Sequence, residues 1–161
     1  MSDFKDVTIM TGAVTETDSL RKTVLTLLNV CDSKDLREII ISYSPKATPE
    51  CKAVVDELAS MKSDVPIITF QQNRKGLAAI VDMIEIAKGS HCILLDSDMA
   101  LDVECVAKMI EGARKDGDTI ITASRWLKGC EFYGYSKSKR FLNFLAQIFL
   151  RILVGKKMTD F

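Results

Sequence analysis

Short apolar runs rich in β-branched residues alternate with segments of helical spacing along most of the chain. This pattern predicts strands at residues 7–11, 38–42, 65–70, 92–95 and 119–123. It predicts helices that start near residues 18, 49, 77, 102 and 136. Together these elements indicate an α/β fold, with a mainly parallel sheet and helices on both of its faces. Ligands of such sheets bind beyond the carboxyl ends of the strands.

Three local signals refine the predicted elements. Thr48 followed by Pro49 is a typical helix start, with a hydroxyl cap and a proline at the first helical position. Gly89 is a typical residue to end the helix that starts near residue 77. The strand at 92–95 is apolar without alternation, so we expect it to be covered on both faces.

Composition then narrows the class of protein. The chain has 161 residues, of which 47% are apolar and 27% charged, with 22 basic and 22 acidic side chains. This length suits one domain, and the composition excludes a disordered or low-complexity chain. The only histidine, His91, argues against a histidine-based metal site or catalytic triad. The five cysteines are widely spaced and form no C-x-x-C pair, so we expect reduced thiols in a cytoplasmic protein.

Asp96 and Asp98 follow the apolar strand at 92–95 directly and are separated only by Ser97. Two carboxylates this close, at the carboxyl end of an inner strand, are costly to bury unless a positive charge neutralises them. Mg²⁺ and Mn²⁺ prefer hard oxygen ligands and often share them with phosphate oxygens. The pattern therefore favours a divalent cation that binds with a diphosphate. The alternative is that the two acids only shape a turn between strand and helix.

The order and spacing of several short motifs resemble those of family 2 glycosyltransferases with the GT-A fold. Residues 93–98 resemble the D-x-D strand of that family. Four more segments resemble family elements in the same order, namely residues 12–16, 73–82, 124–129 and 159–161. The subgroup that the chain resembles is the polyprenyl-phosphate, or dolichol-phosphate type, mannosyl- and glucosyltransferases. The resemblance spans the chain and implies a GT-A, Rossmann-like three-layer sandwich.

The resemblance implies how a nucleotide-diphosphate sugar would be bound. Asp98 would be the direct metal ligand and Asp96 would contact the ribose or the metal, with Mg²⁺ or Mn²⁺ as cofactor. Glu16 would lie near the base or the ribose, and Arg74 would lie in the basic segment that binds this substrate. The alternative for Glu16 is a first-turn carboxylate stabilised by the helix dipole. The alternative for Arg74 is a solvated turn.

The resemblance also implies a catalytic set formed by Asp98, Arg125 and Asp160. Arg125 would face the diphosphate or a lipid phosphate, where a guanidinium can bind in a bidentate manner. Asp160 would border the acceptor pocket. The alternative for Arg125 is a surface ion pair.

The chain departs from the family pattern at the end of the predicted second strand, at Val81, where relatives often have an arginine before Asp82, and at its C-terminus. The predicted second strand ends in residues 42–45, which include no carboxylate, although relatives usually have an acidic pair there that reads the base. The choice between GDP and UDP therefore stays open. The chain stops at Phe161, where relatives continue, so we expect a single GT-A-like domain over residues 1–161 that is truncated at its C-terminus.

The last predicted helix suggests contact with a membrane. Eleven of the fourteen residues from 141 to 154 are apolar, and six cations with no carboxylate lie between Phe132 and Thr159. Fourteen helical residues span about 21 Å, which is too short for a bilayer core of about 30 Å. A helix of this kind suits a surface with anionic headgroups, and we expect peripheral contact through residues 137–157. The alternative is a helix buried against the sheet or in a dimer.

These observations favour a glycosyltransferase of family 2. It would move a hexose from GDP-mannose or a UDP-sugar to an acceptor, a polyprenyl phosphate, with inversion and metal assistance, at the cytoplasmic face of a membrane. The alternative is a non-catalytic GT-A-like module that binds a nucleotide sugar or docks on membranes. A nucleotidyltransferase fits less well, because residues 11–18 contain one glycine and no lysine or arginine. Nucleic-acid binding is disfavoured, because the basic cluster is interleaved with long apolar side chains. The oligomeric state stays open.

Overall fold

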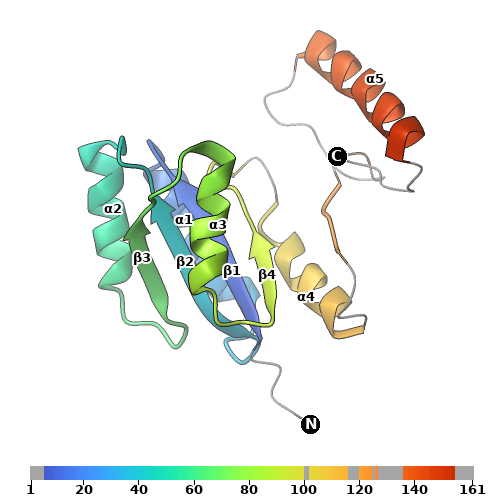
Figure 1. Ribbon diagram of the computed structural model, residues 1–161. Helices are drawn as coiled ribbons and strands as arrows, with labels where there is room; N and C mark the ends of the chain where they lie inside the picture. The colour runs from blue at the N-terminus through green and yellow to red at the C-terminus, as the bar shows by residue number, and fades with distance from the viewer. Residues whose placement is uncertain (1–5, 100–101, 116–119, 125, 127–135, 155–161) are drawn as a thin grey trace. The chain divides into compact units, whose positions relative to one another are not determined.

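The computed structural model describes residues 6–99, 102–115, 120–124, 126 and 136–154. They belong to two units, Met1–Thr119 and Ile120–Phe161, and each unit is described by itself. The described part of the first unit holds a sheet with its helices, and that of the second holds one long helix (Figure 1). The prediction of a single domain over residues 1–161 stays a prediction.

The first unit alternates strands and helices in the predicted order. Its strands are β1 (Val7–Ala13), β2 (Leu36–Tyr43), β3 (Ile67–Gln71) and β4 (His91–Leu94). Its helices are α1 (Asp18–Val30), α2 (Pro49–Ala59), α3 (Ala79–Ile86) and α4 (Cys105–Lys115), with a 3₁₀ turn, η1 (Gly76–Ala78), before α3. The four strands predicted between residues 7 and 95 are therefore confirmed, with boundaries shifted by one or two residues at several ends.

The sheet is parallel throughout, in the order β3-β2-β1-β4. β1 is an inner strand, which pairs Ala13 with Tyr43 of β2 and Met10 with Leu94 of β4. The chain moves outward from β1 to β3 and then returns to place β4 on the other side of β1. Such a reversal is a topological switch point, where ligands bind in open α/β sheets.

Helices cover both faces of the sheet, as the sequence predicts. Buried side chains of α1, α2 and α4 share one core with the strands. On the opposite face Met83 of α3 packs against Met10 and Ile40. Figure 1 shows α3 in front of the sheet and α1 behind it. The predicted α/β architecture with a parallel sheet between two helical layers is confirmed.

The helix cap predicted at Thr48 is confirmed. The Thr48 hydroxyl accepts a hydrogen bond of 3.2 Å from the Cys51 amide, and Pro49 is the first residue of α2. The cap satisfies one of the amides that a helix leaves without a partner in its first turn.

The strand at 92–95 is not covered on both faces, so that prediction is wrong. Leu94 is 46% exposed and Cys92 is also exposed, whereas Ile93 between them is buried. β4 is the outermost strand of the sheet formed by the described residues, and α3 packs over Met10 and Ile40 on the neighbouring strands instead. An apolar side chain on β4 therefore does not imply a buried one.

The strand predicted at 119–123 is not formed at residues 120–123, and Thr119 lies outside the described residues. Ile120 is 89% exposed. The described part of the second unit contains no other strand with which these residues could pair. β-branched residues favour strands chiefly when a neighbour packs against them, so the composition of this run does not suffice here.

Gly89 does not end a helix, because α3 already ends at Ile86. It is instead a point of close approach to β1, where a Cβ atom would lie 2.6 Å from the Asp6 carbonyl oxygen and 2.7 Å from the Thr8 amide nitrogen. The Gly89 amide donates to Thr8 Oγ1 at 2.9 Å. Thr8 Oγ1 in turn donates to the buried carboxylate of Glu38 at 3.1 Å, so this turn joins β1 and β2.

The described part of the second unit is dominated by α5 (Lys137–Val154), which confirms the helix predicted at 136–154. The Ser136 hydroxyl accepts a hydrogen bond of 3.2 Å from the Lys139 amide at the start of the helix. The Trp126 ring lies against Phe144, with 5.6 Å between ring centroids. Among the described helices, none has both the length and the apolarity of a bilayer-crossing segment.

Replacing Gly89 by alanine is predicted to destabilise the first unit by about 1–3 kcal/mol, because the new Cβ must push backbone atoms apart. Gly76→Ala is a matched control, since Gly76 has a φ of +59° but nothing within 4 Å of its Cβ position. That variant should lose only the strain of a left-handed alanine, about 1 kcal/mol. Urea unfolding measures both. Equal losses would show that the close contact at Gly89 carries no extra cost.

Candidate functional site at the carboxyl edge of the sheet

The loops that follow β1, β2 and β3 are joined into one edge by backbone hydrogen bonds. The Gln72 amide, after β3, donates to the Tyr43 carbonyl at the end of β2 at 3.0 Å. The Ser44 amide, after β2, donates to the Ala13 carbonyl of β1 at 2.9 Å. The loops at the carboxyl edge of the sheet, where the candidate site residues are expected, are therefore hydrogen-bonded to the neighbouring strands.

The loop after β4 is tied to the end of β1 on the other side. The Leu95 amide donates to the Met10 carbonyl at 2.9 Å. The Ser97 hydroxyl donates to the Gly12 carbonyl at 2.6 Å, and Ser97 is only 4% exposed. Ser97 thus ties the D-x-D segment to the end of β1, at the switch point between β1 and β4.

Asp96 and Asp98 lie on either side of this buried serine, and both are exposed. The sequence argument for a cation assumed that both carboxylates are buried. It does not apply here, because both residues are exposed to water. Among the described residues no cluster of three or more His, Cys, Asp or Glu side chains forms a complete metal site. Two carboxylates still fit Mg²⁺ or Mn²⁺, since these ions commonly take one or two carboxylates together with substrate phosphates.

Glu16 folds back onto its own loop. Its carboxylate accepts hydrogen bonds from the Val14 amide at 2.6 Å and the Thr15 amide at 2.9 Å. Partial burial acts to raise the pKa of Glu16, but the backbone hydrogen bonds outweigh it and the pKa lies below the ordinary glutamate value. Glu16 is therefore a charged group that shapes the loop after β1, close to the expected position of a ribose.

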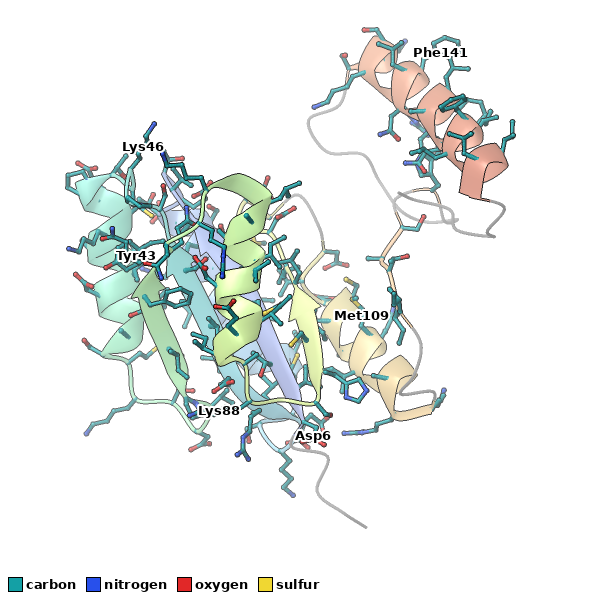
Figure 2. All side chains as sticks on the ribbon, viewed as in Figure 1. Asp6, Tyr43, Lys46, Lys88, Met109 and Phe141 are labelled. Carbon is teal, nitrogen blue, oxygen red and sulfur yellow. The ribbon has the colours of Figure 1, made fainter. Side chains whose placement is uncertain are left out.

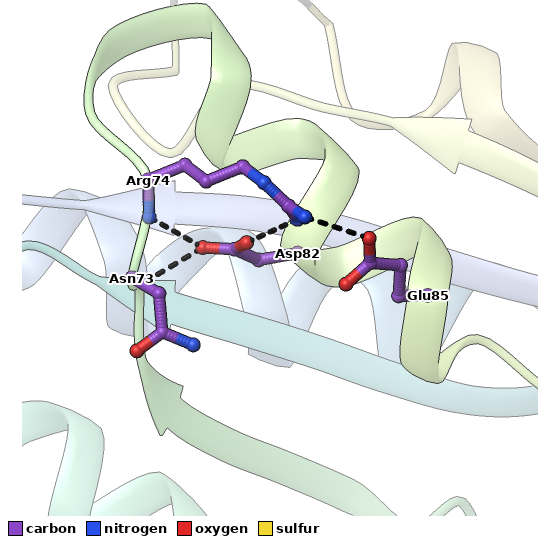
Figure 3. A network of polar contacts seen from close by, with 4 residues as sticks. All are labelled: Asn73, Arg74, Asp82 and Glu85. Atoms are coloured by element: carbon purple, nitrogen blue, oxygen red, sulfur yellow. Dashed lines mark hydrogen bonds and ion pairs between the residues drawn. The ribbon is translucent and has the colours of Figure 1, made fainter.

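Arg74 is held by two acids of α3 (Figure 3). Its guanidinium lies 2.6 Å from Asp82 and 2.8 Å from Glu85. The side chain is about half exposed, which leaves part of it open to solvent. The structure thus places the predicted basic segment at the carboxyl edge, but it engages Arg74 with the protein itself.

Asp82 is the centre of this network and is only 5% exposed. One carboxylate oxygen accepts hydrogen bonds from the Asn73 amide at 2.7 Å and the Arg74 amide at 2.8 Å. The hydrogen bond from the Arg74 amide holds the pKa of Asp82 below its usual value. Burial opposes this effect in part, whereas the Asn73 amide and the Arg74 guanidinium add to it. Asp82 therefore fixes the backbone of the loop after β3.

Two predicted catalytic residues, Arg125 and Asp160, lie outside the described residues. Of the others, the structure brings Glu16, Asp96 and Asp98 to the loops on either side of the switch point, whereas Arg74 lies on the loop after β3.

Two polar residues at this edge were not recognised as structural elements in the sequence. The D-x-D pattern marks Ser97 only as the residue between two acids. In the structure burial alternates here, with Leu95 and Ser97 buried and Asp96 and Asp98 exposed. A period of two continued past the strand would have placed Ser97 inward. The structural role of Asp82 has no signal in the neighbouring residue types, because it binds the backbone amides of Asn73 and Arg74, which every residue except proline has.

Comparison with models of protein families identifies a family that the chain matches. The family model described as "Glycosyl transferase family 2" matches residues 8–160. No curated protein matches the chain. The match covers every element that builds the carboxyl edge.

Replacing Asp82 by asparagine is predicted to lower stability most at neutral pH. The pKa of Asp82 is depressed by folding, so its contribution is present above the ordinary aspartate pKa of about 4 and disappears as the pH falls through the lower folded value. Urea midpoints of both proteins at about pH 7 and about pH 3 should therefore converge on acidification. Asp64→Asn, at an exposed position, is the control. A gap that does not change with pH would contradict the depressed pKa.

Replacing Ser97 by alanine is predicted to cost about 1 kcal/mol of stability, because the hydrogen bond from the buried Ser97 hydroxyl to the Gly12 carbonyl is lost. Ser90→Ala is the matched control, since its hydroxyl is exposed and bonds to the ring of the neighbouring His91. Thermal unfolding distinguishes the two variants. An S97A protein as stable as the wild type would mean that the link between the loops is not energetically significant.

Proposed function

The chain belongs to glycosyl transferase family 2, and we propose that it transfers a hexose from GDP-mannose or a UDP-sugar to a polyprenyl phosphate. Family membership makes it a glycosyltransferase domain that uses a nucleotide-sugar donor and an acceptor. The identity of the hexose, the polyprenyl phosphate and the inversion of configuration are parts of the proposal.

One observation carries the proposal for the donor, namely the hydrogen bond from Ser97 to the Gly12 carbonyl. It ties the segment that contains the exposed acids Asp96 and Asp98 to the end of β1, the strand that precedes Glu16. A nucleotide-diphosphate sugar needs polar contacts along its whole length, from base to diphosphate. The switch point offers such groups on two loops that are tied together.

Asp96 and Asp98 would hold Mg²⁺ or Mn²⁺, with Asp98 as the direct ligand. When bound, the cation neutralises charge on the leaving diphosphate. Glu16 would orient the ribose or the base through its charged carboxylate. Arg125 would bind the diphosphate or the lipid phosphate, and Asp160 would border the acceptor.

The proposed acceptor fits the shortage of general bases. A phosphate oxygen is already anionic, so it needs no proton removed before it attacks the anomeric carbon and displaces the nucleoside diphosphate. The single histidine, His91, begins β4 at the amino edge of the sheet, opposite the switch point. A sugar hydroxyl as acceptor would place a stronger demand on a base.

Replacing Asp98 by alanine is predicted to abolish hexose transfer while the fold stays intact, because an exposed carboxylate contributes little to packing. The assay uses radiolabelled GDP-mannose and UDP-glucose with polyprenyl phosphate and Mn²⁺, and circular dichroism checks folding. Asp64→Ala is the matched control, since Asp64 is exposed but precedes β3 at the amino edge. Transfer by D98A at the wild-type rate would refute the assigned role.

Calorimetry with the same donors separates transfer from binding alone. A wild-type chain that binds a nucleotide sugar without turnover would support the non-catalytic alternative.

A further inference from the structure

The backbone adopts an unfavourable conformation directly after the D-x-D acids. Met99 has a φ of 60°, in the left-handed region that a Cβ atom disfavours. Among the described residues, Met99 is the one residue other than glycine with a positive φ. Conformations of this kind persist only where the surrounding structure imposes them, and they cluster at sites that bind ligands. The contacts of Met99 are therefore expected to hold this turn in place.

The Met99 side chain joins the turn to α1 and to the core of the first unit. Met99 is partly buried and packs against the core that α1, α2 and α4 share with the strands. The completely buried Thr23 hydroxyl of α1 donates a hydrogen bond of 3.2 Å to the Met99 sulfur. Met61 and Met109 pack against the same core, and Figure 2 labels Met109 on α4. Met99 thus links the turn after D-x-D to a residue 76 positions earlier in the chain.

Asp98 lies between two residues that the structure anchors. On one side the buried Ser97 hydroxyl is bound to the Gly12 carbonyl, and on the other side Met99 is bound to Thr23. The backbone of Asp98 is therefore fixed from both sides, whereas Asp98 itself is exposed. A ligand of a metal ion needs such support, because an ill-placed ligand loses affinity for the ion.

We propose that Met99 is a positioning residue, which fixes the backbone of Asp98 so that its carboxylate can bind the cation of the donor. The inference rests on the proposed function, because it requires Asp98 to be the metal ligand. It goes beyond that function by assigning a task to a side chain that does not itself contact the cation. A turn that merely connects β4 with α4 would contribute to stability without any effect on metal binding.

The test measures the affinity of the full chain for GDP and for UDP by calorimetry, with and without Mn²⁺. Met99→Ala removes the anchor on the core but keeps the Cβ atom. It should lower the affinity with Mn²⁺ about tenfold, as expected when the support of a metal ligand is lost, and leave the affinity without Mn²⁺ unchanged. Met99→Leu keeps an apolar anchor and should retain most of the affinity.

Met99→Gly separates metal binding from stability. Glycine adopts a positive φ without strain, so M99G should resist urea better than M99A. It lacks the anchor as well, so it should bind GDP or UDP with Mn²⁺ no more tightly than M99A.

Met61→Ala is the matched control, because Met61 packs against the same core but lies between α2 and β3, at the amino edge of the sheet. It should lose stability and keep the wild-type affinity with Mn²⁺. Asp98→Ala is the reference variant, in which the part of the affinity that depends on Mn²⁺ should disappear.

Three outcomes would overturn the inference: wild-type affinity with Mn²⁺ in M99A and M99G, an equal loss in M99A with and without Mn²⁺, or a wild type whose affinity does not depend on Mn²⁺. In the first two cases, loss of the Mn²⁺-dependent affinity in D98A would leave the metal site of the proposed function in place. A wild type that shows the expected Mn²⁺ dependence but transfers no hexose would refute the transfer and leave the role of Met99 intact.

Discussion

The pairing of β1 with a parallel neighbour on each side is the constraint on which the carboxyl edge depends. Because β2 and β4 are both hydrogen-bonded to β1, the ends of three strands are held in register by backbone alone. The end of β1 is also hydrogen-bonded to the loops after its two neighbours, through Ser44 and Ser97. Residues 85 positions apart in the sequence, Gly12 and Ser97, are thus in contact before any ligand is considered.

Carboxylates at this edge fall into two classes that differ in solvation. Asp82 is buried, and its oxygens are occupied by two amides and a guanidinium, so it contributes a fixed loop. Asp96 and Asp98 are exposed to solvent, and they are the acids proposed to hold the cation of the donor. An acid that is fully engaged inside the protein cannot also coordinate a ligand without loss of those bonds. The proposed cation site is therefore assigned to the exposed residues Asp96 and Asp98 and not to Asp82.

Local sequence signals predicted the inner part of the sheet well and its margins poorly. β1, β2 and the Thr48 cap follow from strand composition and capping chemistry, which act over a few residues. The exposed side of Leu94 and the absent strand at 120–123 depend on which neighbours pack there, and a periodicity does not contain that information. Gly89 shows the same limit, because its requirement comes from backbone atoms of β1 about eighty residues away.

The composition of α5 makes most sense when its two sides are considered separately. Within its own unit the described residues before the helix number seven, and Trp126 packs on Phe144. Seven residues cannot cover the exposed apolar side chains of α5, which include Phe141, Phe149 and Ile152, so that surface requires something outside the described part of the unit.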